Sequence, residues 1–290
     1  MGDSKIKKLK ILITGSNGQL GRSLQEFAVK YPDYNFHFKS SKQLDITSKE
    51  QIDILFAQEE FDYCINCAAY TAVDKAETDQ ENAFLVNAEA VKYLAEACKT
   101  QNSILIHIST DFVFDGTKTT PYVEEDIPNP INVYGASKLK GEQYVQDILE
   151  QFFIIRTSWV YSEYGNNFVK TMLRIGIERD EVSVVNDQLG SPTYASDLAE
   201  VILNIINTNS KSYGIYHYSN EGEISWYEFA SAIFELNKMK VKVNPIPSTS
   251  YSTVAKRPDY SYLDNTKIQK ILGKDLIYDW KFSLSKTCNY

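Results

Sequence analysis

The chain has 290 residues, of which 43% are hydrophobic and 23% are charged, and its formal net charge is −8. This globular balance fits one large domain, or a core domain with a smaller partner. An acidic chain with no cationic block beyond Lys5–Lys10 disfavours nucleic acid as a partner. We also expect no membrane partner and a cytoplasmic location, because no apolar run spans a membrane and the first eight residues do not resemble a signal peptide.

The first predicted elements are a buried strand, Leu9–Thr14, a glycine-rich turn and a helix to about Lys30. The turn contains Gly15, Gly18 and Gly21 at G-x-x-G-x-x-G spacing. Glycines let the backbone approach a pyrophosphate, and the helix N-terminus offers free N–H groups to the same phosphates. This context predicts a dinucleotide site, with an ordinary strand–helix turn as the alternative.

The second strand is expected at about Tyr34–Lys39. An acidic residue near its end usually binds the ribose 2′-hydroxyl of NAD. The residues found there are Lys39, Ser40, Ser41 and Lys42. Cations and hydroxyls suit a 2′-phosphate, so NADP(H) is favoured and NAD(H) is possible; lysines solvated on a loop are the alternative. Asp45 comes later and suits the adenine better than the ribose.

A C-x-x-C pair lies in and just after the third predicted strand, Asp62–Asn66. Its members, Cys64 and Cys67, are three residues apart, so on a strand they would point to opposite faces. The sequence has no second cysteine pair or histidine cluster to complete a zinc site. We therefore expect small buried side chains here, rather than a metal or redox pair.

Strands and helices alternate from residue 9 onward. A helix near Ser48–Gln58 precedes the third strand, and an amphipathic helix over Asn82–Lys99 follows it. This order predicts an α/β fold with a parallel, doubly wound sheet, whose ligands bind at the carboxyl ends of the strands. Ala68 and Ala69 follow the third strand and are small enough for a cofactor to lie against the backbone.

The fourth strand and the helix after it carry the candidate catalytic groups. An apolar strand from Ile104 ends at Thr110, and a helix that starts near Ile131 carries Tyr134 and Lys138. The last two are four residues apart and share one helix face. A nearby ammonium favours the ionised phenol, and a hydroxyl facing that phenol can hold a carbonyl oxygen. The group predicts proton transfer at a C–O bond, with a solvated surface helix as the alternative.

The C-terminal half begins with regular elements and then changes character. Beyond residue 210 the elements are short, and tyrosines and prolines are frequent, which indicates a smaller lobe that covers a ligand. The elements expected before residue 210 are a strand at Phe152–Thr157, a helix after Asn167 to about Arg179, a strand at Val182–Val185 and a helix at Ser196–Asn207. Ser196 is the expected N-cap of the last of these helices.

Two domains are expected from this order of elements. Residues 1–155 would form the dinucleotide-binding domain, with 181–210 returning to it. Residues 156–180 and 211–290 would form a smaller substrate-binding lobe.

Six segments spread over almost the whole chain are recognisable: N-C-A-A-Y-T-A-V-D-K-A-E (66–77), S-T-D-F-V-F-D-G (109–116), N-V-Y-G-A-S-K-L-K-G-E (132–142), R-T-S-W-V-Y (156–161), D-Q-L-G-S-P-T (187–193) and K-R-P-D-Y-S-Y-L-D (256–264). With the glycine-rich turn, they make the chain resemble the dTDP-4-dehydrorhamnose reductases, a family of extended short-chain dehydrogenase/reductases. Cys67 departs from the family, which commonly has alanine there.

The resemblance implies a Rossmann-type sheet and the NAD(P)H-dependent reduction of a 4-keto-6-deoxy sugar nucleotide, dTDP-4-dehydro-L-rhamnose, at C4. Tyr134 would protonate the carbonyl oxygen. Lys138 would bind the nicotinamide ribose and lower the pKa of the phenol. Thr110 would hold the carbonyl by a hydrogen bond. Some family members use Mg²⁺ at a dimer contact through glutamates. No carboxylate cluster here identifies that site, so we expect no essential metal. We expect a monomer or a homodimer.

Two sets of residues are expected to line the site. Arg257 would pair with the diphosphate through its planar fork. The cofactor set is Gly15, Asn17, Gly18, Gln19, Leu20, Gly21, Lys39, Ser40, Ser41, Asp45, Ile46, Cys67, Ala68, Ala69, Tyr70, Tyr134 and Lys138. The substrate set is Val73, Thr110, Asp111, Phe112, Tyr134, Trp159, Asn167 and Arg257.

Other functions of the same fold remain as alternatives. A 4,6-dehydratase would need Thr-Asp-Glu at the strand end, but Phe112 follows Asp111 here. An epimerase is disfavoured only by the D-Q-L-G-S-P-T and K-R-P segments. A reductase of another 4-keto sugar nucleotide is a further alternative. A non-catalytic regulator, like the regulatory subunit of methionine adenosyltransferase, is disfavoured by the intact Thr110, Tyr134 and Lys138.

Overall fold

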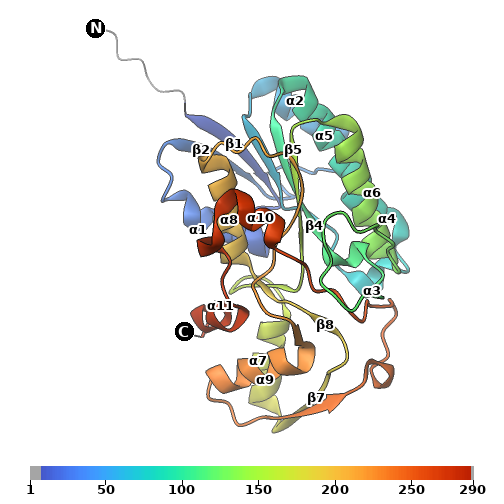
Figure 1. Ribbon diagram of the computed structural model, residues 1–290. Helices are drawn as coiled ribbons and strands as arrows, with labels where there is room; N and C mark the ends of the chain where they lie inside the picture. Colours follow the sequence, from blue (N-terminus) through green and yellow to red (C-terminus); the bar gives the residue numbers. More distant parts are fainter. Residues whose placement is uncertain (1–7, 289–290) are drawn as a thin grey trace.

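The computed structural model describes residues 8–288 and is built around a parallel sheet of six strands, in the order β10-β5-β4-β3-β1-β2 (Figure 1). The expected absence of a signal peptide therefore concerns residues that, apart from Lys8, lie outside the described part. The strands are β1 (Leu9–Thr14), β2 (Tyr34–Lys39), β3 (Tyr63–Asn66), β4 (Ile104–Thr110), β5 (Phe152–Thr157) and β10 (Gly214–His217).

Helices cover both faces of this sheet (Figure 1). One face packs against α1 (Gln19–Ala28), α8 (Ala195–Asn207) and α10 (Thr266–Leu272). The other face packs against α2 (Lys49–Gln58), α5 (Ala90–Gln101) and α6 (Val133–Ile148). The expected doubly wound, Rossmann-type α/β fold is thus confirmed.

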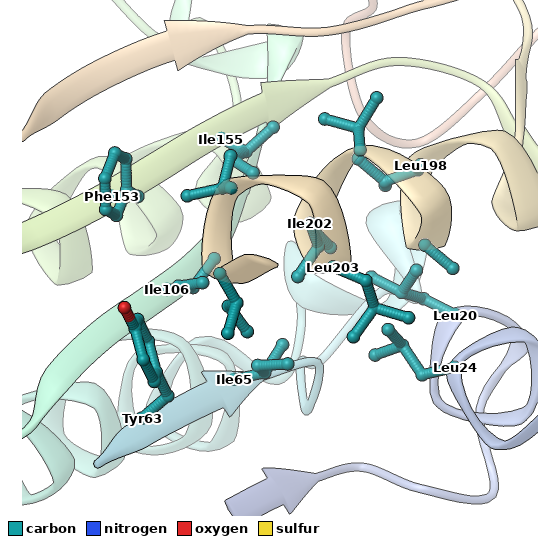
Figure 2. Packing of buried hydrophobic residues seen from close by; sticks show 14 of the residues in the cluster. Leu20, Leu24, Tyr63, Ile65, Ile106, Phe153, Ile155, Leu198, Ile202 and Leu203 are labelled. Carbon is teal, nitrogen blue, oxygen red and sulfur yellow. The ribbon is translucent and has the colours of Figure 1, made fainter. Parts of the chain in front are cut away.

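The strands are apolar on both sides because both faces are covered. Ile11 and Ile13 of β1 belong to the cluster under α1 and α8, whereas Leu12 between them belongs to the cluster on the opposite face. Figure 2 shows the first cluster, in which Leu24 of α1 and Ile202 of α8 point toward the side chains of the central strands. This alternation is the period-two pattern of a strand buried on both sides.

The register brings the carboxyl ends of the central strands to one edge. Thr14 pairs with Asn66, and Asn66 pairs with His107 three residues before the end of β4. Thr110 pairs with Thr157 at the end of β5. The glycine-rich turn, the segment after β3 and the end of β4 therefore lie beside one another.

A smaller lobe lies beyond this edge (Figure 1). Its core is an apolar cluster around Phe229 and Ile233, which includes Val169 and Met172 of the facing helix. Its elements are β6 (Val160–Tyr161), α7 (Phe168–Glu178), β7 (Glu181–Val185), β8 (Leu189–Gly190), β9 (Thr193–Tyr194), β11 (Ile224–Ser225), α9 (Trp226–Leu236), β12 (Lys242–Ile246), η3 (Ser248–Ser250) and α11 (Trp280–Lys286). The short helix η4 (Lys274–Leu276) packs beside α8 and α10 against the main sheet.

The chain crosses between sheet and lobe more often than the sequence indicates. β7 falls within 181–210, the range expected to return to the sheet domain, but it pairs with β12 in the lobe. β10 falls within 211–290, the range expected for the lobe, but it pairs with β5 in the main sheet. Short strands carry too little pattern to show which sheet they join.

Two local expectations were wrong. Ser196 does not cap its helix: α8 begins at Ala195, with Tyr194 as the N-cap residue and without a side-chain cap. The helix expected over Asn82–Lys99 is not uniform, because α4 (Gln80–Phe84) and α5 are joined by a π-helical turn, η1 (Leu85–Glu89). Such turns often occur at functional sites, and this one presents Asn87 to the segment after β3.

Candidate active site

The glycine-rich turn forms a close-packed cradle at the end of β1. Gly15 has a φ of +64°, and a Cβ there would lie 2.6 Å from the backbone nitrogen of Ala68. A Cβ on Gly21 would lie 2.5 Å from the carbonyl oxygen of Gly15. The N-cap residue of α1, Gly18, has no side-chain cap, so the first N–H groups of the helix remain available to an anion. The turn therefore fits a pyrophosphate.

The residues after β2 lie next to this cradle, because the amide of Ser16 donates to the carbonyl oxygen of Lys39. Lys42 is exposed, whereas Ser40 is buried and its hydroxyl donates to Gln43. Asp45 is exposed, but its carboxylate accepts from the amide and hydroxyl of Thr47. Lys39 and Lys42 are thus the cations available to a 2′-phosphate.

The segment after β3 is held by the π-helical turn. The Asn87 side chain accepts from the amide of Tyr70 at 2.8 Å and donates to its carbonyl oxygen at 3.0 Å. It also donates to the hydroxyl of Ser137 on α6. Asn87, which the sequence did not single out, thereby fixes the predicted cofactor segment against the catalytic helix.

The helix α6, which carries the predicted catalytic residues, begins beside the end of β4. Asn132 caps it by accepting from the amide of Gly135. A Cβ on Gly135 would lie 2.1 Å from the carbonyl oxygen of Phe112, so glycine permits this approach. The ring of Phe112 packs edge-on against Tyr134, with centroids 5.6 Å apart. Thr110 and Tyr134 are brought together, with a hydrogen bond between their hydroxyls.

The pKa of Tyr134 is raised to about 12, chiefly by burial, while the hydrogen bond with Thr110 lowers it. The sequence led us to expect a lowered pKa through Lys138. In the structure burial is the larger effect. Tyr134 therefore stays protonated at neutral pH, which is the form that an acid needs.

Lys138 is fully inside the protein, with 1% of its surface exposed. Its Nζ donates to the carbonyl oxygen of Ile108 at 2.6 Å and lies 3.3 Å from Nε2 of His107. Burial lowers its pKa to about 8, and the negative charge of Glu142 opposes the shift. Lys138 thus carries its charge at neutral pH, but its pKa lies only a little above neutrality.

Glu142 lies one turn after Lys138 and forms a buried ion pair with Arg156 of β5. Its Oε2 accepts from Arg156 Nη2 at 2.7 Å and its Oε1 from Nε at 3.0 Å. The hydroxyl of Ser109 also donates to Glu142. This pair was not predicted as part of the site, although its residues stand in two of the recognised segments.

Asp111, directly after Thr110, is 2% exposed. Its Oδ1 accepts from the hydroxyl of Thr110 at 3.0 Å, whereas its Oδ2 has no partner among the described residues. Burial raises its pKa to about 6, and the nearby hydroxyls of Ser261 and Thr110 oppose the shift. An unpartnered buried oxygen beside the hydroxyls of Thr110 and Tyr134 suits a polar ligand.

A cavity of about 410 Å³ lies between this edge of the sheet and the lobe. Trp159, which has a φ of +47°, stacks on Trp226 with centroids 3.6 Å apart. The remaining lining residues are Phe112, Phe168, Thr171, Met172, Ile175, Val182, Ser183, Val184, Val185, Gln188, Tyr251, Arg257, Pro258 and Ser261. Trp226 was missed because a tryptophan at the start of a helix gives no signal of a site.

The predicted substrate residues of the lobe differ in whether they line the cavity. Trp159 and Arg257 line the cavity, but Arg257 is already paired with Asp74 through two bonds of 2.7 and 3.1 Å. Asn167 caps α7 and donates to Gln19 at 2.9 Å, so it links the glycine-rich turn to the lobe. Neither Asn167 nor Val73, at the start of α3 (Val73–Ala76), is among the lining residues.

Helical membrane spans and metal clusters are both absent from the described residues, 8–288. Within this part of the chain, none of the helices is both long and apolar enough to cross a membrane. The same residues contain no group of three or more His, Cys, Asp or Glu side chains arranged to hold a metal ion. The C-x-x-C pair does not form a disulfide, with Cys64 buried and Cys67 partly buried.

Comparison with known proteins shows that this chain is similar to one family over almost its whole length. The family described as the RmlD substrate binding domain matches residues 9–289. The dTDP-4-dehydrorhamnose reductase of Aggregatibacter actinomycetemcomitans is 45% identical, over 97% of this chain and 99% of that protein. The Escherichia coli reductase of the same name is 37% identical, over 97% of each chain.

A solved structure is equally similar. The crystal structure of dTDP-4-dehydrorhamnose reductase from Bacillus anthracis, in complex with NADP, has a TM-score of 0.92 and 43% identity. The similarity covers 97% of this chain and 98% of that one.

Removing the buried charge next to Lys138 tests how the site is held. We expect Glu142→Gln to lower the free energy of unfolding by about 3–5 kcal/mol, because it leaves Arg156 buried without its partner charge. Urea unfolding followed by circular dichroism measures this. The matched control is Glu178→Gln, which breaks the exposed pair with Arg174 and should cost less than about 0.5 kcal/mol. Equal effects of the two changes would contradict a structural role for the buried pair.

Proposed function

This chain belongs to the dTDP-4-dehydrorhamnose reductase family, and from this premise we propose how it reduces dTDP-4-dehydro-L-rhamnose to dTDP-L-rhamnose with the residues described above. The observation that carries the assignment is the meeting of Thr110, Tyr134 and Lys138 at the edge of the sheet. Phe112 lines the cavity of the lobe and packs against the ring of Tyr134. A nicotinamide dinucleotide bound in the cradle supplies the hydride for the C4 carbonyl carbon.

Tyr134 is the acid in this proposal. Its raised pKa keeps the phenol protonated until the carbonyl oxygen develops negative charge. The hydroxyl of Thr110 lies beside the phenol and holds the same oxygen, which orients the carbonyl carbon. Lys138 holds the nicotinamide ribose and supplies positive charge next to the phenolate that remains after proton transfer.

The lobe holds the nucleotide part of the substrate. The stacked pair of Trp159 and Trp226 offers a flat apolar face to the base, which suits aromatic stacking. Arg257 lies at the cavity wall and is oriented by Asp74, so its guanidinium is in place for the diphosphate. Asp111 offers its unpartnered oxygen to a sugar hydroxyl.

NADP(H) is the preferred cofactor in our proposal, supported by Lys39, Ser40, Ser41 and Lys42 after β2 and by the absence of an acidic side chain among them. NAD(H) remains the alternative. The cytoplasmic location, the monomer or homodimer and the lack of an essential metal stay predictions.

The first test is the oxidation of NADPH by Tyr134→Phe, with dTDP-4-dehydro-L-rhamnose generated in place by the upstream enzymes. Loss of the acid should lower kcat by about 10²–10⁴-fold, while cofactor affinity stays within a few-fold because little volume is removed. Tyr144→Phe, on the same helix but bonded to Glu89, is the control and should keep full activity. Turnover within a few-fold of the parent would remove Tyr134 as the acid.

The second test is the pH dependence of kcat/KM. Burial lowers the pKa of Lys138 to about 8, so its charge is present below this pH and lost above it. We therefore expect kcat/KM to fall above about pH 8, whereas the phenol of Tyr134 stays protonated. Lys138→Met should lower the rate at every pH and abolish the fall. A fall that persists in this variant belongs to another group.

The third test concerns the choice of cofactor. The double change Lys39→Ala with Lys42→Ala removes two charges near the expected 2′-phosphate, so KM for NADPH should rise about tenfold while KM for NADH changes little. Initial rates with each cofactor measure this. Lys8→Ala with Lys30→Ala removes two charges far from the cradle and is the control. An equal rise for both cofactors would remove the argument for a phosphate site.

A further inference from the structure

His107 is a buried titratable residue to which the proposed reaction assigns no role. It lies inside β4, is 0% exposed and stands between Asn66 on β3 and Lys138 on α6. Its Nδ1 is 3.1 Å from the Asn66 amide nitrogen, and its Nε2 is 3.3 Å from Lys138 Nζ. The ring is therefore in direct contact with the amine that is proposed to hold the cofactor.

The orientation of the Asn66 amide is determined by its other neighbours. Its Oδ1 lies 3.2 Å from the backbone amide of Ala68 and 2.6 Å from the hydroxyl of Thr14. A backbone N–H can only donate, so the atom facing it is the oxygen. The Asn66 NH₂ group consequently points at His107 Nδ1 as a donor.

This donor determines the tautomer of His107. A neutral imidazole has one N–H and one acceptor nitrogen, and Asn66 occupies the acceptor at Nδ1. The proton is therefore on Nε2, which faces Lys138. Burial and the charge of Lys138 lower the pKa of His107 well below its ordinary value, which keeps the ring neutral.

Lys138 then meets an N–H group rather than an acceptor on this side. The Lys138 ammonium donates to the Ile108 carbonyl oxygen at 2.6 Å. On its other side, its N–H groups face the N–H of His107, so two donors meet there without an acceptor. As a neutral amine it can accept that N–H with its lone pair and still donate to Ile108. The contact thus favours the neutral amine over the ammonium.

The second buried histidine shows that this arrangement is particular to His107. His217 on β10 is also 0% exposed, but its Nδ1 lies 3.0 Å from the carbonyl oxygen of Tyr122, and its Nε2 lies 3.4 Å from Nη1 of Arg156. An acceptor on one side and a donor on the other satisfy a neutral ring completely. His107, with donors on both sides, is satisfied only when Lys138 gives up a proton.

We infer that His107 is a positioning residue for the reaction. Asn66 fixes its ring with Nε2–H toward Lys138, and this contact holds the amine in place and favours its neutral form over the ammonium. The inference rests on the role proposed above for Lys138. The other charged or titratable groups around Lys138 are Tyr134 and Glu142 on α6, Asp111 after β4, and Arg156 on β5, which neutralises Glu142. None of these replaces the N–H at 3.3 Å.

Two substitutions separate the two ring nitrogens. The terminal atoms of asparagine reach the place of Nδ1, and those of glutamine reach the place of Nε2. His107→Asn therefore keeps the partner of Asn66 and removes the N–H that faces Lys138, whereas His107→Gln returns an amide with its own N–H donor to the place of Nε2. Both changes are polar and similar in size, so each controls for the loss of packing in the other.

The experiment is an NMR titration of lysine labelled at ¹³Cε in the full chain, with the Lys138 signal identified by its absence in Lys138→Met. We expect the pKa of Lys138 in His107→Gln to stay within about 0.3 units of the parent, and in His107→Asn to rise by at least about 0.5 units. The fall of kcat/KM at high pH should move upward by the same amount in His107→Asn alone. A loss of packing alone would lower kcat at all pH values and leave its pH dependence in place.

A second measurement reads the tautomer directly. Long-range ¹H–¹⁵N spectra of the parent should show one histidine as the neutral Nε2–H form from pH 5 to 9, absent in His107→Gln. An Nδ1–H form of His107 itself, the signal lost in His107→Gln, or equal Lys138 pKa values in the two variants, would overturn the inference. The two NMR measurements need no turnover, so they decide the role of His107 separately from the sugar-dependent assay that tests the proposed function.

Discussion

The close approach of α6 to the backbone of Phe112 and Asn87 is the constraint on which the site depends. A Cβ on Gly135 would lie 2.1 Å from the carbonyl oxygen of Phe112, and one on Gly141 would lie 2.2 Å from that of Asn87. Only glycine permits these distances, and the helix consequently lies with its polar side chains inside the protein. Lys138 and Glu142 are therefore buried, and each has to find partners there.

Burial changes the chemistry of these side chains. It raises the pKa of Tyr134 to about 12 and lowers that of Lys138 to about 8, because in both cases it disfavours the charged form. The phenol of Tyr134 therefore stays protonated at neutral pH, whereas the ammonium of Lys138 loses its proton more readily than an exposed lysine does. The Glu142–Arg156 pair limits the shift at Lys138, and the N–H of His107 acts in the opposite direction. The reducing direction of the reaction agrees with a phenol that starts protonated.

Contacts between side chains of both parts join the sheet and the lobe. Gln19 of the glycine-rich turn accepts from Asn167 and from Ser162 in the lobe, and Arg257 pairs with Asp74 beside the sheet. The cofactor cradle and the substrate cavity are thus held in a defined relation by side chains of both parts. Since the chain crosses between sheet and lobe several times, neither part is a continuous segment of the sequence.

The sequence by itself determined the sheet and the glycine-rich turn and predicted the reacting groups, because these depend on local signals: apolar runs of strand length, glycines at a strand–helix turn, and a tyrosine and lysine one helical turn apart. It also identified the family. Only the tertiary structure decided what surrounds those groups. The partners of Lys138 come from β4, the counter-charge of Glu142 from β5, Asn87 from a π-helical turn, and Trp226 from the lobe. Burial and hydrogen bonding between distant segments set the pKa values and oriented the rings, and no spacing along the chain encodes which distant side chains meet.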